Sequence, residues 1–534
     1  MIYINQFFLN IFNQLRQIYL YSKLYDKRIS KIDNKDLIYK PSPHFLSSLF
    51  KYDKKIKIEN FSIDAVWKSE KINNKEYKRL NNFFWILSLD LKSSKKTVQS
   101  FITYWINKNQ KYNNRSWNSD LTAKRIISWL SCHNLTYDES DKHYKNSFNI
   151  LIQKQTNHLI NEIKRSELID DKLIICASII LVGLCYKNER SYLSFGSNLL
   201  KKISKETLDN YCFPKSRNVK QLVFYLKYFV LIREWYKESQ TEIPEYINET
   251  IHYLGQGYAF IWQSINCDLL FNGNTNSSNE SFDGYLERLG YKFKNESQEL
   301  GGYIIFKNKK ICLAMDIGST PNAKYTKDYQ AGALSFEILS NGKKLISNCG
   351  YYKKANNNLN RISKSSSAQN TLTIDDHSSC QFNKIDNSWI IKKGIKIFKK
   401  DSIFKKDYWK INASHNGYQK KYNSIHEREI EFYPEQMTFI GKDTILKKKN
   451  YNYKFDIRFH FEPTVKLMKT QDNKTILIEL ADEGWKFTCE NHDINIDNGL
   501  YFGNKNLYTD NQNIFIAGIS NNQTENIRWE IKKI

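Results

Sequence analysis

The period of the apolar residues changes once along the chain, and this change constrains the fold more than any other feature. From about residue 71 to residue 254, apolar residues recur every three or four positions, and short polar connections separate the runs. This spacing is typical of amphipathic helices with one buried face. Helices joined by short connections pack as antiparallel pairs, and enough pairs in series can curve into a ring. The first half therefore predicts a multihelical domain.

After the polar stretch at residues 275–281, the period becomes two. Along residues 334–338, the apolar side chains Leu334, Phe336 and Ile338 fall on one face of an extended segment, and polar side chains fall on the other. Similar segments recur to the C-terminus, separated by Asn, Asp and Gly turns. Strands at this spacing are typical of a large antiparallel sandwich. The sequence thus predicts an α+β multidomain protein.

A chain of 534 residues is too long for one hydrophobic core, so we expect two large domains. The change of period places their boundary between residues 272 and 283. We predict an N-terminal helical extension over residues 1–60, a helical domain over residues 61–272 and a β-sandwich domain over residues 283–534.

The net charge of the chain indicates which classes of partner it can bind. It has 81 Lys and Arg against 56 Asp and Glu, which gives a net charge of +25 and favours a polyanion such as nucleic acid, anionic lipid or an acidic polysaccharide. The sequence has no RNA-recognition, helix-turn-helix or zinc-finger pattern, so we expect no nucleic-acid partner. Its nine cysteines form no CxxC pair, so neither a zinc ribbon nor a thioredoxin-type site is predicted.

The first 19 residues carry apolar positions at helical spacing. Two alternatives remain open for this helix: it packs on its own domain, or it lies on a membrane surface as a peripheral contact. The segment lacks the basic start and continuous apolar run of a secretory signal. The longest apolar run, Leu173–Cys185, has the length of a buried core helix rather than of a membrane span.

An ordered series of motifs resembles the heparinase II/III-like family of polysaccharide lyases. In the second half these motifs are Met315–Gly318, Ala331–Glu337, Ile346–Gly350, Ala368–Leu372, Ser414–Tyr418, His426–Arg428 and Ile457–Phe461. In the first half, segments Trp85–Asp90, Trp105–Ile106 and Trp117–Leu130 are similar to the helical portion of a bacterial branch of this family. The resemblance covers about residues 60–534. It implies an N-terminal incomplete α/α toroid followed by a C-terminal antiparallel β-sandwich.

The resemblance also implies a chemistry, which is β-elimination on a uronate polymer. An amide or a cation neutralises the sugar carboxylate, a base takes the C5 proton, and an acid protonates the leaving oxygen. The family usually places histidines where this chain has Asp328, Gln330 and Gln369. Where many members have a metal-binding Asp, the chain has Asn348, and Lys364 stands where an Arg is usual.

These departures limit what the resemblance carries over. A glutamine cannot act as a general base near neutral pH, and amide oxygens are poor zinc ligands, so we expect no cofactor and a degraded family metal site. We expect the two glutamines to open onto a groove between the two domains. His415 has an alternative role as a hydrogen-bonding link between loop and strand, and Asn218 as the cap of the following helix. The candidate catalytic residues are Gln330, Gln369, His415 and Tyr418, and the candidate substrate-binding residues are Arg217, Asn218, Asn348 and Lys364.

Two hypotheses of function follow. In the first, the protein acts on an acidic, uronate-containing glycan by β-elimination. In the second, it is a catalytically impaired relative that binds an anionic glycan or assists polysaccharide metabolism at the cell envelope. The resemblance implies a location in the envelope or periplasm, and the missing signal pattern leaves the cytoplasm as the alternative. The sequence does not indicate an oligomeric state.

Overall fold

The computed structural model describes residues 2–32, 37–50, 74–89, 95–166, 168–186, 190–277, 279–354, 357–385, 388–449, 451–504 and 507–534. The chain folds into two compact units. The first consists of Met1–Thr207, Phe224–Ile251 and Glu280–Lys292, and the second of Leu208–Val223, His252–Asn279 and Phe293–Ile534.

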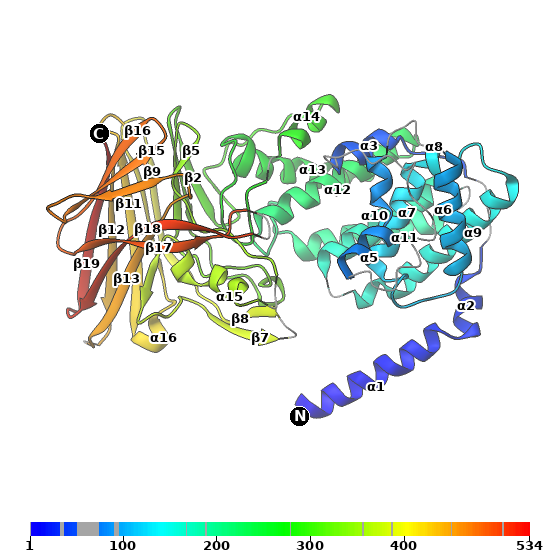
Figure 1. Cartoon of the computed structure of the whole chain (residues 1–534), viewed down its shortest axis with the longest axis horizontal. Helices are drawn as coiled ribbons and strands as arrows, with labels where there is room; N and C mark the ends of the chain where they lie inside the picture. The colour runs from blue at the N-terminus through cyan, green and yellow to red at the C-terminus, as the bar shows by residue number, and fades with distance from the viewer. Residues whose placement is uncertain are drawn as a thin grey trace. The chain divides into compact units, whose positions relative to one another are not determined.

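The first unit is helical, as the three-to-four-residue period predicts (Figure 1). Helix α10 is apolar on all sides, and nearly all its side chains from Leu173 to Cys185 are buried among α7, α9 and α11, which confirms the expected core helix. The α-helices that lie wholly or partly in this unit are α1 (Ile2–Leu20), α2 (Lys23–Ile29), α3 (Pro43–Leu49), α5 (Asn74–Asn81), α6 (Lys95–Lys108), α7 (Ser119–Ser131), α8 (His133–Thr136), α9 (Lys142–Glu162), α10 (Ile169–Cys185), α11 (Arg190–Thr207), α12 (Val219–Glu238), α13 (Glu245–Tyr258) and α14 (Glu280–Arg288).

The second unit carries the strands, and all of their pairings within the sheets are antiparallel. One sheet has the order β1-β2-β3-β4-β5, a second β14-β15-β16-β19-β12-β11-β10-β9, and a third β17-β18-β13-β6, while β7 and β8 form a two-stranded hairpin. The strands are β1 (Glu299–Leu300), β2 (Tyr303–Lys307), β3 (Ile311–Asp316), β4 (Phe336–Ser340), β5 (Lys343–Ile346), β6 (Leu372–Ile374), β7 (Gln381–Ile385), β8 (Ser388–Lys393), β9 (Ile397–Phe404), β10 (Trp409–His415), β11 (Ser424–Tyr433), β12 (Thr438–Lys447), β13 (Tyr453–His460), β14 (Lys466–Lys469), β15 (Thr475–Leu480), β16 (Glu483–Cys489), β17 (Ile494–Tyr501), β18 (Thr509–Ser520) and β19 (Thr524–Lys533).

One hydrophobic core joins the three larger sheets. Phe336 of β4 stacks on Trp529 of β19 at a ring distance of 5.5 Å, and Phe459 of β13 packs edge-on against the same indole at 4.9 Å. Strand β11 alternates buried and half-buried side chains along its length, as a period of two requires. The predicted fold class, a helical domain followed by an antiparallel β-sandwich, is confirmed.

The boundary between the units differs from the single one that we predicted between residues 272 and 283. Two segments from the helical half, Leu208–Val223 and His252–Asn279, belong to the second unit. The physical reason is a set of polar contacts to the first strands. Arg217 and Asn272 both bond to Asp316 at the end of β3, at 2.6 and 3.0 Å.

The N-terminal segment folds as the expected helix α1. In its described second half, Phe12, Leu15 and Ile18 expose 68%, 58% and 69% of their surface, so these side chains do not pack on the domain. None of the helices that the structure describes combines the length and the apolar character needed to cross a membrane.

Candidate functional site

The structure brings Gln330 and Gln369 together, but inside the second unit. The Gln330 amide nitrogen donates to the carbonyl oxygens of Gly350 and Ser363 at 2.9 and 2.6 Å, and its oxygen accepts from the Gly273 N–H at 3.0 Å. The Gln369 amide donates to the same Ser363 oxygen at 3.2 Å. The two glutamines therefore share one backbone acceptor.

This burial corrects the expectation that the two side chains open onto a groove. Gln330 and Gln369 are each 1% exposed. A buried amide must have its donors and acceptor satisfied, and backbone groups satisfy those of Gln330 in full. The two glutamines hold loops together, and the structure buries both of the side chains that we predicted to be catalytic.

His415 and Tyr418, which we also predicted to be catalytic, lie buried in the sandwich. The His415 side chain is fully buried, and its two ring nitrogens lie 3.1 Å from His426 Nδ1 and 3.0 Å from the Gly417 N–H. The hydroxyl of Tyr418, which is 1% exposed, donates to the carbonyl of Leu372 at 2.5 Å. The alternative role of His415, a link between loop and strand, matches these contacts.

Burial also controls the protonation of this histidine pair. It lowers the pKa of His415 well below its ordinary value, and the neighbouring His426 adds to this effect. Burial lowers the pKa of His426 too, although its partner Asp443, at 2.6 Å, opposes the change. Both rings therefore stay neutral near pH 7, as expected for members of a packed core.

Arg217 uses its guanidinium to hold two glycine-containing segments, the turn at Gly301 and Gly302 and the chain at Gly318. Four of its N–H bonds are directed to the carbonyl oxygens of Gly301, Gly302 and Gly318, at 2.9–3.0 Å, and to Asp316. The side chain is 7% exposed. The prediction that Arg217 binds substrate through its charge is corrected, because Asp316 already neutralises it inside the second unit.

Asn218 caps helix α12, as the alternative proposed. Its side-chain oxygen accepts from the N–H groups of Lys220 and Gln221 at 2.9 and 3.2 Å. Its amide nitrogen points elsewhere and donates to the carboxylate of Asp328 at 3.3 Å.

This contact belongs to a group of residues that we name the Asp328 cluster: Asn218, Asp328, Tyr351, Asn360 and Lys364. The Tyr351 hydroxyl donates to the other oxygen of Asp328 at 2.9 Å and accepts from the Asn360 amide at 3.3 Å. Lys364 Nζ lies 5.9 Å from the Tyr351 ring centroid. Asp328 is the one half-buried member of the cluster, and the other four residues are buried.

Electrostatics in the cluster follow from burial. Burial raises the pKa of Tyr351 well above its usual range, and the charge of Asp328 raises it further. Burial lowers the pKa of Lys364 to about 8, although Asp328 opposes the shift. The Lys364 ammonium donates to the carbonyl oxygens of Lys327 and Trp389, which fixes its position. A tyrosine, a carboxylate, an amide and a titratable amine thus lie together.

Asn348 sits apart from the Asp328 cluster and is fully buried. Its side-chain oxygen accepts from the Asn370 N–H at 2.9 Å, and its backbone N–H donates to Glu337 at 2.8 Å. Asn348 therefore lies in the interior of the second unit, and its buried amide nitrogen has no hydrogen-bond partner among the described residues. Among the residues that the structure describes, no group of three or more His, Cys, Asp or Glu is placed to share a metal ion.

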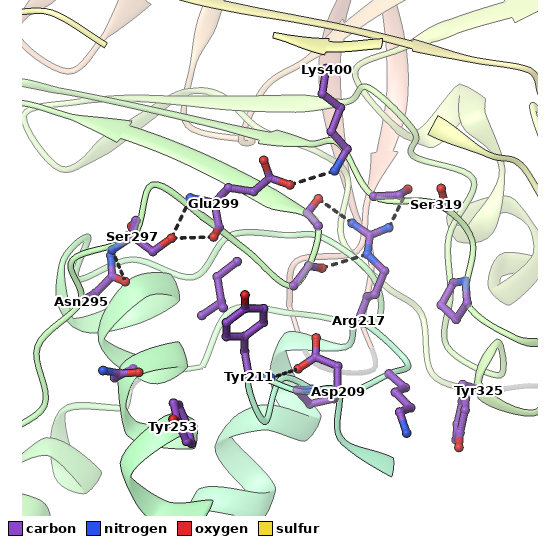
Figure 2. Close-up of a pocket in the computed structure, with 18 of the residues that line it drawn as sticks. Asp209, Tyr211, Arg217, Tyr253, Asn295, Ser297, Glu299, Ser319, Tyr325 and Lys400 are labelled. Atoms are coloured by element: carbon purple, nitrogen blue, oxygen red, sulfur yellow. Dashed lines mark hydrogen bonds and ion pairs between the residues drawn. The ribbon is translucent and has the colours of Figure 1, made fainter. Parts of the chain in front are cut away.

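Arg217 also lines a cavity of about 990 Å³ (Figure 2). All of its lining residues belong to the second unit. Three tyrosines stand in it: Tyr211 on a loop, Tyr253 on α13 and Tyr325 on a 3-10 turn. Sequence reasoning missed Tyr253 and Tyr325 because they come from distant segments without a shared motif. It also missed Tyr351, whose one signal is its place directly after the Ile346–Gly350 motif.

A helical unit followed by a three-sheet antiparallel sandwich is an architecture of polysaccharide lyases. Residues 295–530 match the family model of the heparinase II/III-like C-terminal domain. Residues 295–530 therefore form a heparinase II/III-like C-terminal domain, in agreement with the family that the motifs of this half resemble.

Solved structures with the same fold cover nearly the whole chain. A heparinase III gene product with methylated lysines has a TM-score of 0.70 at 12% identity, over 94% of this chain and 86% of its own. A mutant of the heparan sulfate lyase HepC from Pedobacter heparinus has a TM-score of 0.69 at 12% identity, over 96% and 87%. A further heparinase III has a TM-score of 0.69 at 13% identity, over 96% and 89%. The chain matches none of the curated protein sequences.

Proposed function

We propose that this protein is a polysaccharide lyase that acts on an acidic, uronate-containing glycan by β-elimination at the Asp328 cluster. The fold shared with heparinases and the net charge of +25 support this function. The observation that carries it is the chain of contacts from the Asn218 amide through Asp328 to the Tyr351 hydroxyl, at 3.3 and 2.9 Å. This arrangement supplies each group type that the elimination needs.

The residues divide the reaction as follows. The Asn218 amide binds the uronate carboxylate, and the positive charge of the buried Lys364 helps to neutralise it without direct contact, which acidifies the C5 proton. The Tyr351 oxygen takes this proton while its own proton passes to Asp328, to which it is already bonded. The electron pair of the C5–H bond forms the C4–C5 double bond, and the C4–O bond breaks. Asp328 then returns its proton through Tyr351 to the leaving oxygen.

Replacing the Tyr351 hydroxyl tests this function. The Tyr351→Phe variant is expected to lower kcat on the uronate polymer that is cleaved by about 10²-fold or more, because proton transfer loses its carrier. The measurement is the ultraviolet absorbance of the unsaturated product across a panel of uronate-containing polymers. Tyr451→Phe, at a side chain 56% exposed on the sandwich, is the matched control and should keep full activity. Equal activity of the two variants would contradict the role of Tyr351.

A second function, binding of an anionic glycan without cleavage, is favoured by one observation. Glutamines replace the two expected imidazoles, and the sandwich histidines His415, His426 and His460 are hydrogen-bonded elsewhere. Absence of unsaturated product over the whole panel, together with measurable affinity for one of its polymers by calorimetry, would establish binding and exclude elimination.

A further inference from the structure

We propose that the cavity beside Arg217 is a second carbohydrate site, and that it takes an uncharged segment of a glycan. Its described lining includes the three tyrosines and several amide and hydroxyl side chains, but neither Asp328 nor Tyr351. A volume of about 990 Å³ lies at the upper end of the roughly 300–1,000 Å³ typical of ligand sites, which is enough for more than one sugar ring. This proposal goes beyond elimination and does not depend on it.

The tyrosines give the cavity aromatic faces for sugar rings. Figure 2 shows Tyr211 in the middle of the cavity, with Tyr253 and Tyr325 on opposite sides of it. Tyr211 is 66% exposed although its backbone is held, because its N–H and that of Phe213 both donate to Asp209 at 2.9 Å. An aromatic ring kept exposed on a fixed loop offers an apolar face and a polar tip, which suits the C–H face and the hydroxyls of a pyranose.

The charge of the lining sets the class of sugar. The cationic lining residues are Lys215, Arg217 and Lys400, and the anionic ones are Asp209, Glu296 and Glu299. Three positive and three negative charges sum to zero, in a chain whose net charge is +25. The excess positive charge of the molecule is therefore not directed into this cavity.

Two of the three cations of the cavity are paired with carboxylates. Arg217 is bonded to Asp316 at 2.6 Å, and Lys400 to Glu299 at 2.8 Å. A uronate carboxylate that entered the cavity would lose hydration and lie near the like charges of Asp209 and Glu299. Arg217 and Lys400 would not compensate this cost, because each is already paired with a carboxylate. The hydroxyls of a neutral sugar avoid this cost and can donate to the same carboxylates.

The floor of the cavity is formed before any ligand arrives. Gly301 and Gly302 have φ values of +59° and +79°, which L-residues with side chains rarely adopt. A Cβ at Gly318 would lie 2.2 Å from the Arg217 guanidinium carbon. Because Arg217 bonds to the carbonyl oxygens of all three glycines, the floor is rigid, and binding does not have to order it.

Calorimetry on the full chain tests the proposal with neutral gluco-, manno- and galacto-oligosaccharides and with uronate oligosaccharides, each at low and high salt. We expect at least one neutral series to bind with an affinity that changes less than about twofold with salt, because no net charge is involved. Tyr211→Ala and Tyr253→Ala should each weaken this binding by about tenfold. Tyr451→Ala, a matched exposed tyrosine on the sandwich, should leave it unchanged.

Other outcomes would overturn the proposal. These are absence of binding by every neutral series, equal loss in Tyr451→Ala, or a Tyr211-dependent affinity found only with uronates and falling steeply with salt. The two functions can fail separately. Tyr351→Phe should leave the affinity for neutral glycans intact, so glycan binding can be observed even if no unsaturated product forms. Conversely, if Tyr211→Ala does not change glycan binding, the protein can still cleave uronate polymers.

Discussion

At the scale of single residues, Gln330 shows how a catalytic position can become a structural one. Its side chain joins Gly273, Gly350 and Ser363, which come from three separate segments of the second unit. An imidazole has two ring nitrogens and a different shape, so it cannot reproduce three bonds from one planar amide. The amide is thus a clamp on backbone groups.

Removing the hydrogen bonds of the Gln330 amide should lower the free energy of unfolding. Gln330→Ala leaves a buried N–H and two buried carbonyl oxygens without their partner, so we expect the free energy of unfolding to fall by about 1–3 kcal/mol. Urea denaturation measures the change, and Gln436→Ala, at an exposed turn, should stay within about 0.5 kcal/mol. We also expect Gln330→His to bring no gain in elimination activity, and such a gain would show that this position still reaches substrate.

Lys364 should make stability depend on pH. Its pKa is about 8 in the folded protein and 10.5 as the ordinary value, so the unfolded chain holds more protons between these values. Stability should therefore rise with pH between about 8 and 10.5, by at most about 1.4 kcal/mol per pH unit. The measurement is the urea midpoint between pH 7.5 and 9.5. Lys364→Met should remove this rise, and an unchanged slope in that variant would contradict the assignment.

At the scale of secondary structure, helix α1 has an exposed apolar face that the rest of the described chain does not cover. Phe12, Leu15 and Ile18 recur at helical spacing and each exposes more than half of its surface. A helix of this kind can lie in the interface of a membrane, with its apolar side chains inserted among the lipids. Peripheral membrane contact is therefore the proposal that we retain for this segment.

Vesicle binding tests the role of α1. The double variant Phe12→Ser, Leu15→Ser should bind anionic vesicles at least about tenfold more weakly than the unchanged chain, because two inserted side chains are lost. Co-sedimentation provides the measurement. Met468→Ser, at a side chain 64% exposed on β14, controls for the general loss of an apolar surface residue. Equal effects of both changes would assign the binding to another surface.

Sequence patterns predicted the elements better than the contacts among them. The helical and alternating periods gave the class of each half, because a period reports which face of an element is buried. The site was harder to predict. Asn218, Asp328 and Tyr351 meet through loops whose paths no local period encodes, and the family motif gave no reason to expect that Gln330 turns inward. His415 looked functional because its motif matched, although a motif does not report burial.

At the scale of the whole molecule, the second unit depends on chain from the helical half. Asp316, 1% exposed, is bonded to Arg217 and Asn272, and Glu337, fully buried, accepts from the Leu270 N–H. A polypeptide of residues 293–534 lacks all three partners. It would retain buried carboxylates that have lost part of their donors, since Glu337 keeps Asn348 and Lys344 and Asp316 keeps the Gly318 N–H, and this loss is destabilising.

Dividing the chain tests this dependence. Residues 293–534 expressed alone should show no cooperative urea transition, whereas co-expression with residues 1–292 should restore one and yield a complex that purifies as a single species. Near-ultraviolet circular dichroism reports the packing of the core around Trp529. A fully cooperative transition in the isolated polypeptide would show that the upstream segments add little.

The interleaving of the two units also restricts how such a gene can change. Recombination that exchanges only the downstream half would import a sandwich whose Asp316 and Glu337 equivalents no longer find the arginine, asparagine and backbone amide they need. Viable exchanges would have to carry the short stretches around residues 208–223 and 252–279 along with the strands. The lineage of this protein is therefore expected to inherit both halves as one piece.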